Sequence, residues 1–289
     1  MSTPTPDVRT QLVSHFSTAT GSTAHGQKWD ELYQANFLPW DKGFPSPALV
    51  DLLSSPPPST NPAYPNLLPS PSSATGKRKK ALVPGCGKGY DVLLLAAHGY
   101  DAYGLEISAN ALKEAKKVEG EKGNEEVYST RKGVERGAVT WVVGDFFEDG
   151  FLRDVLGEAE QGKFDLIYDY TFLSALPPVM RSAWSRRFNE LLAPEGRLIC
   201  LEFPTYKPAS TGGPPWALPP KIYMAHLPRP GEELSYGEDG ELLEEKIGEP
   251  SRNGLVRIAH WQPERTHEIG YDADGKVTDW ISAWAHPQV

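Results

Sequence analysis

The sequence is poor in cysteine and has no long apolar run. Cys86 and Cys200 are its only two cysteines, so a disulfide framework is excluded and a reducing compartment, the cytoplasm, fits best. No window approaches 18 consecutive apolar residues, and the N-terminus lacks a basic start followed by an apolar stretch. We therefore expect neither a membrane span nor secretion.

Positive charge is also scarce. The chain has 29 Lys and Arg against 38 Asp and Glu, a formal net charge of -9. Nucleic-acid binding relies on clustered basic side chains that neutralise phosphates, so DNA and RNA are disfavoured as partners. The basic run at residues 77–80 could be a targeting signal, but a run that enters a strand is usually only solvated.

The length of 289 residues and the hydrophobic fraction of 39% suit one globular α/β domain with extensions. Helical spacing is expected at residues 26–36 and 48–53. A Pro- and Ser-rich stretch follows, whose composition predicts mobility because it offers little apolar surface to bury. We divide the chain into N-terminal helices (1–53), a flexible insertion (54–80), a core (81–264) and a C-terminal extension (265–289).

From residue 81 onward, short apolar strands alternate with helices, which predicts a mostly parallel sheet with helices on both faces. Residues 242–248 and 256–262 alternate around a turn and predict a terminal antiparallel hairpin. The expected strands are 81–83, 102–105, 139–143, 164–168 and 198–203, and the expected helices are 92–98, 109–117 and 179–192.

A glycine loop directly follows the first of these strands. Gly85, Gly87 and Gly89 form a G-x-G-x-G pattern that lets a ligand approach the backbone and the free N–H groups of the next helix. The dinucleotide fingerprint needs its third glycine one position later, where Tyr90 stands, so NAD chemistry is disfavoured though not excluded. A tight turn without a ligand remains the alternative.

Three further loops should share this edge of the sheet, because the carboxyl ends of parallel strands meet there. Glu106 ends the second strand, where a carboxylate can accept both ribose hydroxyls of a nucleoside. Asp145 and Phe146 follow the third strand and offer an acceptor for an adenine amine and a ring to pack on the base. Asp169 and Tyr170 follow the fourth. The alternatives are helix capping by the carboxylates and a core position for Phe146.

At these residues the chain resembles the thiopurine S-methyltransferase family, and more closely its branch of plant and fungal halide/thiol (thiocyanate) methyltransferases. The resemblance extends over residues 26–264. The matching stretches are residues 29–33 (WDELY), 39–47 (PWDKGFPSP), 81–91 (ALVPGCGKGYD), 104–108 (GLEIS), 164–172 (FDLIYDYTF) and 212–215 (GGPP).

The resemblance implies a class I S-adenosylmethionine-dependent methyltransferase with a Rossmann-like sheet and an N-terminal helical lid. The implied reaction leaves S-adenosylhomocysteine as product. Trp29, Trp40 and Gly43 would pack on the cofactor; from the residues alone, the tryptophans would be core. The groups implied opposite the lid are Gly85, Gly87, Glu106, Asp145, Phe146 and Tyr170.

The acceptor implied by the resemblance is a small thiol, with sulfide, thiocyanate or halide ions as further acceptors. Tyr170, Asp169 and Tyr33 are the candidates for orienting or polarising it, and the sequence shows no metal-ligand cluster. Trp216 stands where a tyrosine often follows the GGPP stretch, which leaves acceptor size open. A bulkier thiol or secondary metabolite, or cofactor binding without catalysis, are the alternatives. We expect a monomer.

Overall fold

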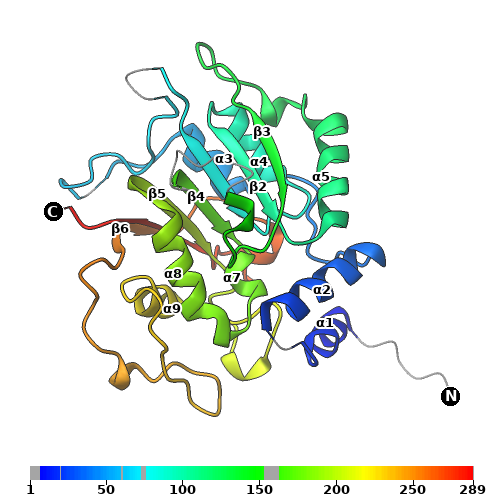
Figure 1. Cartoon of the computed structure of the whole chain (residues 1–289), viewed down its shortest axis with the longest axis vertical. Helices are drawn as coiled ribbons and strands as arrows, with labels where there is room; N and C mark the ends of the chain where they lie inside the picture. The colour runs from blue at the N-terminus through cyan, green and yellow to red at the C-terminus, as the bar shows by residue number, and fades with distance from the viewer. Residues whose placement is uncertain (1–6, 20, 60, 73–75, 153–162, 289) are drawn as a thin grey trace.

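The computed structural model of the chain (Figure 1) describes residues 7–19, 21–59, 61–72, 76–152 and 163–288. A seven-stranded sheet in the order β3-β2-β1-β4-β5-β7-β6 forms its centre. The first five strands of this order are parallel, and β7 runs antiparallel to both β5 and β6. The strands are β1 (Lys80–Pro84), β2 (Asp101–Glu106), β3 (Val139–Val143), β4 (Phe164–Tyr170), β5 (Leu192–Glu202), β6 (Val256–Trp261) and β7 (Trp280–Ala285).

Helices cover both faces of the sheet. One apolar layer joins α3 and α4 to side chains such as Ala81 and Leu166, and the other joins α8 and α9 to neighbours such as Leu82 and Ile167. Side chains alternate between the two faces along a strand, so consecutive strand residues pack into different apolar layers. The helices are α1 (Val8–Phe16), α2 (Gly21–Gln34), α3 (Pro47–Ser54), α4 (Tyr90–Ala97), α5 (Ala109–Lys122), α7 (Phe172–Ala175), α8 (Arg181–Leu191) and α9 (Pro220–His226).

The predicted fold class is confirmed: a mostly parallel sheet with an antiparallel strand pair and helices on both faces. The predicted hairpin is wrong, because residues 242–248 form no strand: Leu242 makes an isolated bridge with Tyr236, and Glu244–Lys246 is a 3-10 turn. The partner of β6 is β7, from the segment expected to be an extension. Strand β7 lies between β5 and β6 and is buried over most of its length, so its apolar residues lack the alternation of a half-exposed strand.

The Pro- and Ser-rich stretch is anchored to the core at several points. Tyr64 and Leu67 are buried. The Tyr64 hydroxyl donates to the carbonyl of His286 at 2.9 Å, and Tyr100 donates to Pro69. The stretch thus makes specific contacts with the core at these positions, and its expected mobility stays a prediction; residues 60 and 73–75 lie outside the described residues.

The basic run before β1 is partly neutralised. Arg78 pairs with Glu135 at 2.7 Å, and Lys79 lies 3.7 Å from Asp165. Within the described ranges, no helix combines the length and apolar character that a membrane crossing requires.

Candidate functional site

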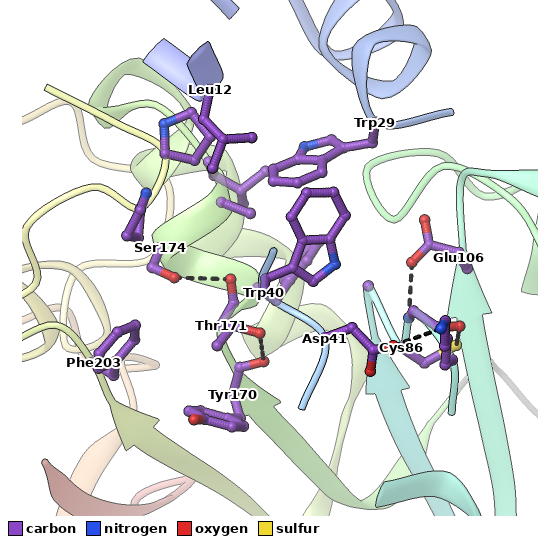
Figure 2. Close-up of a pocket in the computed structure, with 18 of the residues that line it drawn as sticks. Leu12, Trp29, Trp40, Asp41, Cys86, Glu106, Tyr170, Thr171, Ser174 and Phe203 are labelled. Carbon is purple, nitrogen blue, oxygen red and sulfur yellow. Dashed lines mark hydrogen bonds and ion pairs between the residues drawn. The ribbon is translucent and has the colours of Figure 1, made fainter. Parts of the chain in front are cut away.

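A cavity of about 820 Å³ opens at the carboxyl edge of the parallel strands. Its walls come from α1, α2, the glycine loop, the ends of β2, β3 and β4, and the segment after residue 264. Figure 2 shows Glu106 and Cys86 on one side of it, and Tyr170 and Phe203 on the other, with Trp29 and Trp40 above. The cavity therefore collects most of the residues predicted from the sequence.

The glycine loop forms one wall. Gly85, Gly87 and Gly89 have φ angles of 58°, 54° and 76°, a left-handed conformation that favours glycine. A Cβ at Gly85 would lie 2.5 Å from the Phe172 ring, and one at Gly87 would lie 2.8 Å from the Tyr33 hydroxyl. Glycine is thus required both for the turn and for the space that the loop leaves open.

Glu106 is bound to the same loop. Its Oε2 accepts the Gly87 N–H at 3.0 Å and its Oε1 accepts the Ser108 N–H at 3.1 Å. Burial raises the pKa of this carboxyl, and the backbone donors oppose that shift. Each carboxylate oxygen keeps a second lone pair for a ligand hydroxyl.

The loop after β3 places Asp145 and Phe146 at the cavity. Asp145 accepts the Phe147 N–H at 2.9 Å, and the Phe146 ring packs edge-on against Phe172 with centroids 5.0 Å apart. Phe146 is buried, so the core and the cavity share its ring. Arg187 donates to the Phe146 carbonyl at 2.8 Å and fixes this loop.

The N-terminal segment closes the cavity from above. Trp29 and Trp40 line it and meet edge-to-face, with ring centroids 5.0 Å apart. Ser108 donates to Asp30 of α2 at 2.5 Å, which ties this helix to the start of α5. Gly43 does not line the cavity; its carbonyl accepts a hydrogen bond from Lys122 at 2.8 Å.

Two of the three candidate acceptor-orienting residues reach the cavity. Tyr33 and Tyr170 line it, and burial raises the pKa of both phenols well above 10, so both are neutral. Asp169 does not line it. Its carboxylate accepts the Trp184 indole N–H at 2.8 Å and the Leu173 N–H at 3.3 Å, and burial raises its pKa to about 6. Asp169 therefore serves the protein interior rather than the cavity.

One residue that sequence reasoning missed is His267. Its buried ring stacks on Tyr170 at 5.7 Å and an 11° interplanar angle, and contacts Phe44 at 4.7 Å. Burial, followed by the nearby Lys42, lowers its pKa to about 4, and its Nδ1 has no hydrogen-bond partner. No motif surrounds His267 in the sequence. Its position at the cavity is therefore set by the tertiary fold and not by a local signal.

The sequence is similar to those of known methyltransferases. Residues 24–260 match the sequence profile of the family described as Thiopurine S-methyltransferase. The probable thiol methyltransferase 2 of Arabidopsis thaliana is 32% identical over 82% of this chain and 85% of that protein. The thiocyanate methyltransferase 1 of the same plant is 28% identical, over 90% and 91%.

A solved structure supports the fold. It comes from work on the conversion of a disulfide bond into a thioacetal group during echinomycin biosynthesis. It aligns with a TM-score of 0.51 at 17% identity and covers 90% of this chain and 92% of its own. The predicted family and the predicted fold are both confirmed. The chain belongs to the thiopurine S-methyltransferase family, and S-adenosylmethionine is its cofactor.

Proposed function

We propose that this protein transfers the methyl group of S-adenosylmethionine to the sulfur of a small thiol, with sulfide, thiocyanate and halide ions as further acceptors. The names of the plant relatives support this acceptor class. The observation that carries the proposal is the single cavity in which the Glu106 and glycine-loop wall faces Tyr170 and Phe203. One side suits a nucleoside and the other a soft acceptor.

The cofactor fits the polar side of the cavity. Gly85 and Gly87 hold open a cradle that side chains would fill, and Glu106 offers lone pairs to the ribose hydroxyls. Asp145 and Phe146 are the groups proposed for the adenine, and Trp29 and Trp40 would cover the cofactor from the lid. Gly43 supports this lid through its bond to Lys122 without lining the cavity.

The other side needs little acid or base chemistry. When bound, the cofactor supplies a methyl group already activated by a sulfonium. The protein's main task is therefore to hold the acceptor atom about 3 to 3.5 Å from the methyl carbon and in line with its bond to sulfur. Tyr170 and Tyr33, neutral phenols, can donate a hydrogen bond to an anionic acceptor. Phe172 lines the cavity and helps to exclude water from it, which favours polarisable nucleophiles.

We further propose a cytoplasmic monomer that acts without nucleic acid and whose residues 1–53 serve as the cofactor lid. Both cysteines are unpaired, which fits a reducing compartment. The net charge of -9 disfavours polyanions.

Two measurements test the function. Calorimetry should detect binding of S-adenosylmethionine and S-adenosylhomocysteine, and incubation with methyl-labelled cofactor should give labelled thioethers from a panel of thiols. The panel also includes sulfide, thiocyanate, iodide and bromide. Tight cofactor binding without product from any acceptor would leave only a silent binding protein, and absence of binding would refute the site itself.

A further inference from the structure

The mouth of the cavity carries apolar side chains that the protein leaves exposed. They come from four separate segments: the start of α1, the loop before α3, the loop after β5 and the segment before β7. Water-exposed large apolar residues gathered at one opening mark a surface that a ligand covers. These residues are Val8, Phe44, Tyr206 and Ile269, with exposed fractions of 46%, 50%, 60% and 42%.

Two cations stand beside these apolar residues. Arg9 follows Val8, Lys207 follows Tyr206, and both line the cavity. Arg9 donates to the Thr211 carbonyl at 3.2 Å, and Lys207 donates to the carbonyls of Gly212 and Pro215. Neither is seen paired with an acidic side chain among the described residues. Because Thr211 and Gly212 are adjacent, the two cations lie near each other. Burial, followed by the charge of Arg9, lowers the pKa of Lys207 to about 8.

The acidic groups of the cavity are engaged elsewhere. Asp41 pairs with Lys88, and Glu106 accepts backbone N–H groups of its own loop. Asp7, the acid beside Arg9, caps α1 by accepting from the backbone N–H groups of Arg9 and Thr10. Asp7 keeps its charge close to Arg9, but neither Arg9 nor Lys207 forms a side-chain ion pair among the described residues, so both cations can still pair with a ligand carboxylate.

We propose that the methyl acceptor is a thiol with an apolar body and a carboxylate remote from its sulfur. The proposal rests on the S-methylation proposed above and narrows its acceptor class. The body would cover Phe44 and Tyr206 at the mouth, the carboxylate would pair with Arg9 and Lys207, and the sulfur would reach inward to Tyr170. The new S–CH₃ bond forms as the sulfonium–methyl bond breaks, its electron pair stays on the cofactor sulfur, and the thiol proton goes to water.

A matched pair of acceptors tests this proposal: 4-mercaptobenzoate and the uncharged 4-mercaptobenzamide. The measured quantity is the ratio of their kcat/KM values. We expect the wild type to prefer the carboxylate by about tenfold or more, as a charge-assisted hydrogen bond would give. Arg9→Gln and Lys207→Gln should each remove most of this preference through KM, and added salt should weaken it.

Two further variants separate charge from structure. Lys207→Arg keeps the charge and should retain the preference, whereas Arg186→Gln removes an exposed charge outside the cavity and should leave it unchanged. Should Lys207→Gln fail to fold because its loop loses two bonds, Arg9→Gln still decides. Equal use of both thiols by the wild type, or a preference that survives both glutamine variants, would overturn the inference while the proposed function stood. Methylation of neither thiol, alongside product from the wider thiol and halide panel, would also overturn the inference, whereas absence of product from that whole panel would count against the function.

Discussion

Lys88 of the glycine loop and Asp41 of the N-terminal segment form an ion pair, with 2.5 Å between the Lys88 Nζ and the Asp41 Oδ2. Both side chains are only 19% exposed, so water screens the pair less than it would on the surface. The pair joins the lid to the loop on which the cofactor is proposed to rest. Lid closure and cofactor retention should therefore be coupled.

Asp41→Asn should weaken S-adenosylmethionine binding about fivefold, an effect of about 1 kcal/mol, because the lid loses its charged contact to the loop. Calorimetry measures the S-adenosylmethionine dissociation constant of the wild type, Asp41→Asn, Lys88→Met and the double variant. The double variant should bind little worse than either single variant, since both remove the same contact. Strictly additive losses would contradict the coupling.

Gly85→Val should abolish cofactor binding and leave most of the fold intact. The positive φ of Gly85 disfavours a side chain, and a Cβ there would lie 2.5 Å from Phe172 at the cavity wall. Gly120→Ala is the matched control, because a Cβ at this α5 position meets no atom within 4 Å, and alanine favours the helix by about 1 kcal/mol. Calorimetry and circular dichroism compare the two, and unchanged affinity in Gly85→Val would refute the loop as the cofactor site.

The parallel core was predictable from the sequence because its signals are local. Glycine at 85 and 87 and an acid at 106 follow apolar strands at regular spacing, and each marks a strand end. Strand β7 was missed for the opposite reason. Its pairing with β5 joins residues about 80 apart in the chain, and its largely buried side chains carry no period that would separate it from an unstructured extension.

The residues around the cavity also differ in whether a local sequence signal predicts their positions. Glu106 and Asp145 stand where strand ends alone place them. Asp169 does not follow the strand as expected, because β4 continues to Tyr170, and its side chain points away from the cavity. The Asp169 carboxylate instead satisfies the buried Trp184 N–H. His267 has no local signal at all, because its place depends on the long path from β6 to β7. Sequence reasoning therefore predicted which strand ends border the cavity better than it predicted where each side chain points.

Asp169→Asn should change stability more than catalysis. Burial raises the folded pKa to about 6 from an ordinary value of 3.8, so the folded state binds the proton more tightly. Its stabilising contribution is thus full below pH 3.8 and lost as the pH rises through about 6, an effect on the order of 3 kcal/mol. Denaturant unfolding from pH 4 to pH 7 should show this fall in the wild type and a flatter profile in the variant.

Asparagine cannot accept both hydrogen bonds, so this variant should also be less stable than the wild type at every pH. Its kcat should stay within about threefold, because the carboxylate does not line the cavity. A loss of several orders of magnitude in kcat with normal cofactor affinity would restore Asp169 as a candidate for acceptor chemistry.

Substitutions of His267 should separate effects on acceptor binding from effects on cofactor binding. His267→Phe keeps a ring between Tyr170 and Phe44 but removes both nitrogens, whereas His267→Ala removes the ring as well. Because the Nδ1 has no protein partner, we expect His267→Phe to raise the acceptor KM about tenfold and to leave the S-adenosylmethionine dissociation constant within about twofold. His267→Ala should weaken both, since Phe44 belongs to the lid and would lose its packing.

The pH dependence gives this residue an independent test. Burial beside Lys42 depresses the folded pKa to about 4, below the ordinary 6.5, so the unfolded chain takes up the proton first. The contribution of the neutral ring to stability is therefore full above pH 6.5 and lost as the pH falls towards 4. Between pH 7 and pH 5 the wild type should lose on the order of 1 to 2 kcal/mol more than His267→Phe in urea unfolding. Equal losses would mean that the imidazole is solvated, and the effect expected for His267→Phe on the acceptor KM would lose its basis.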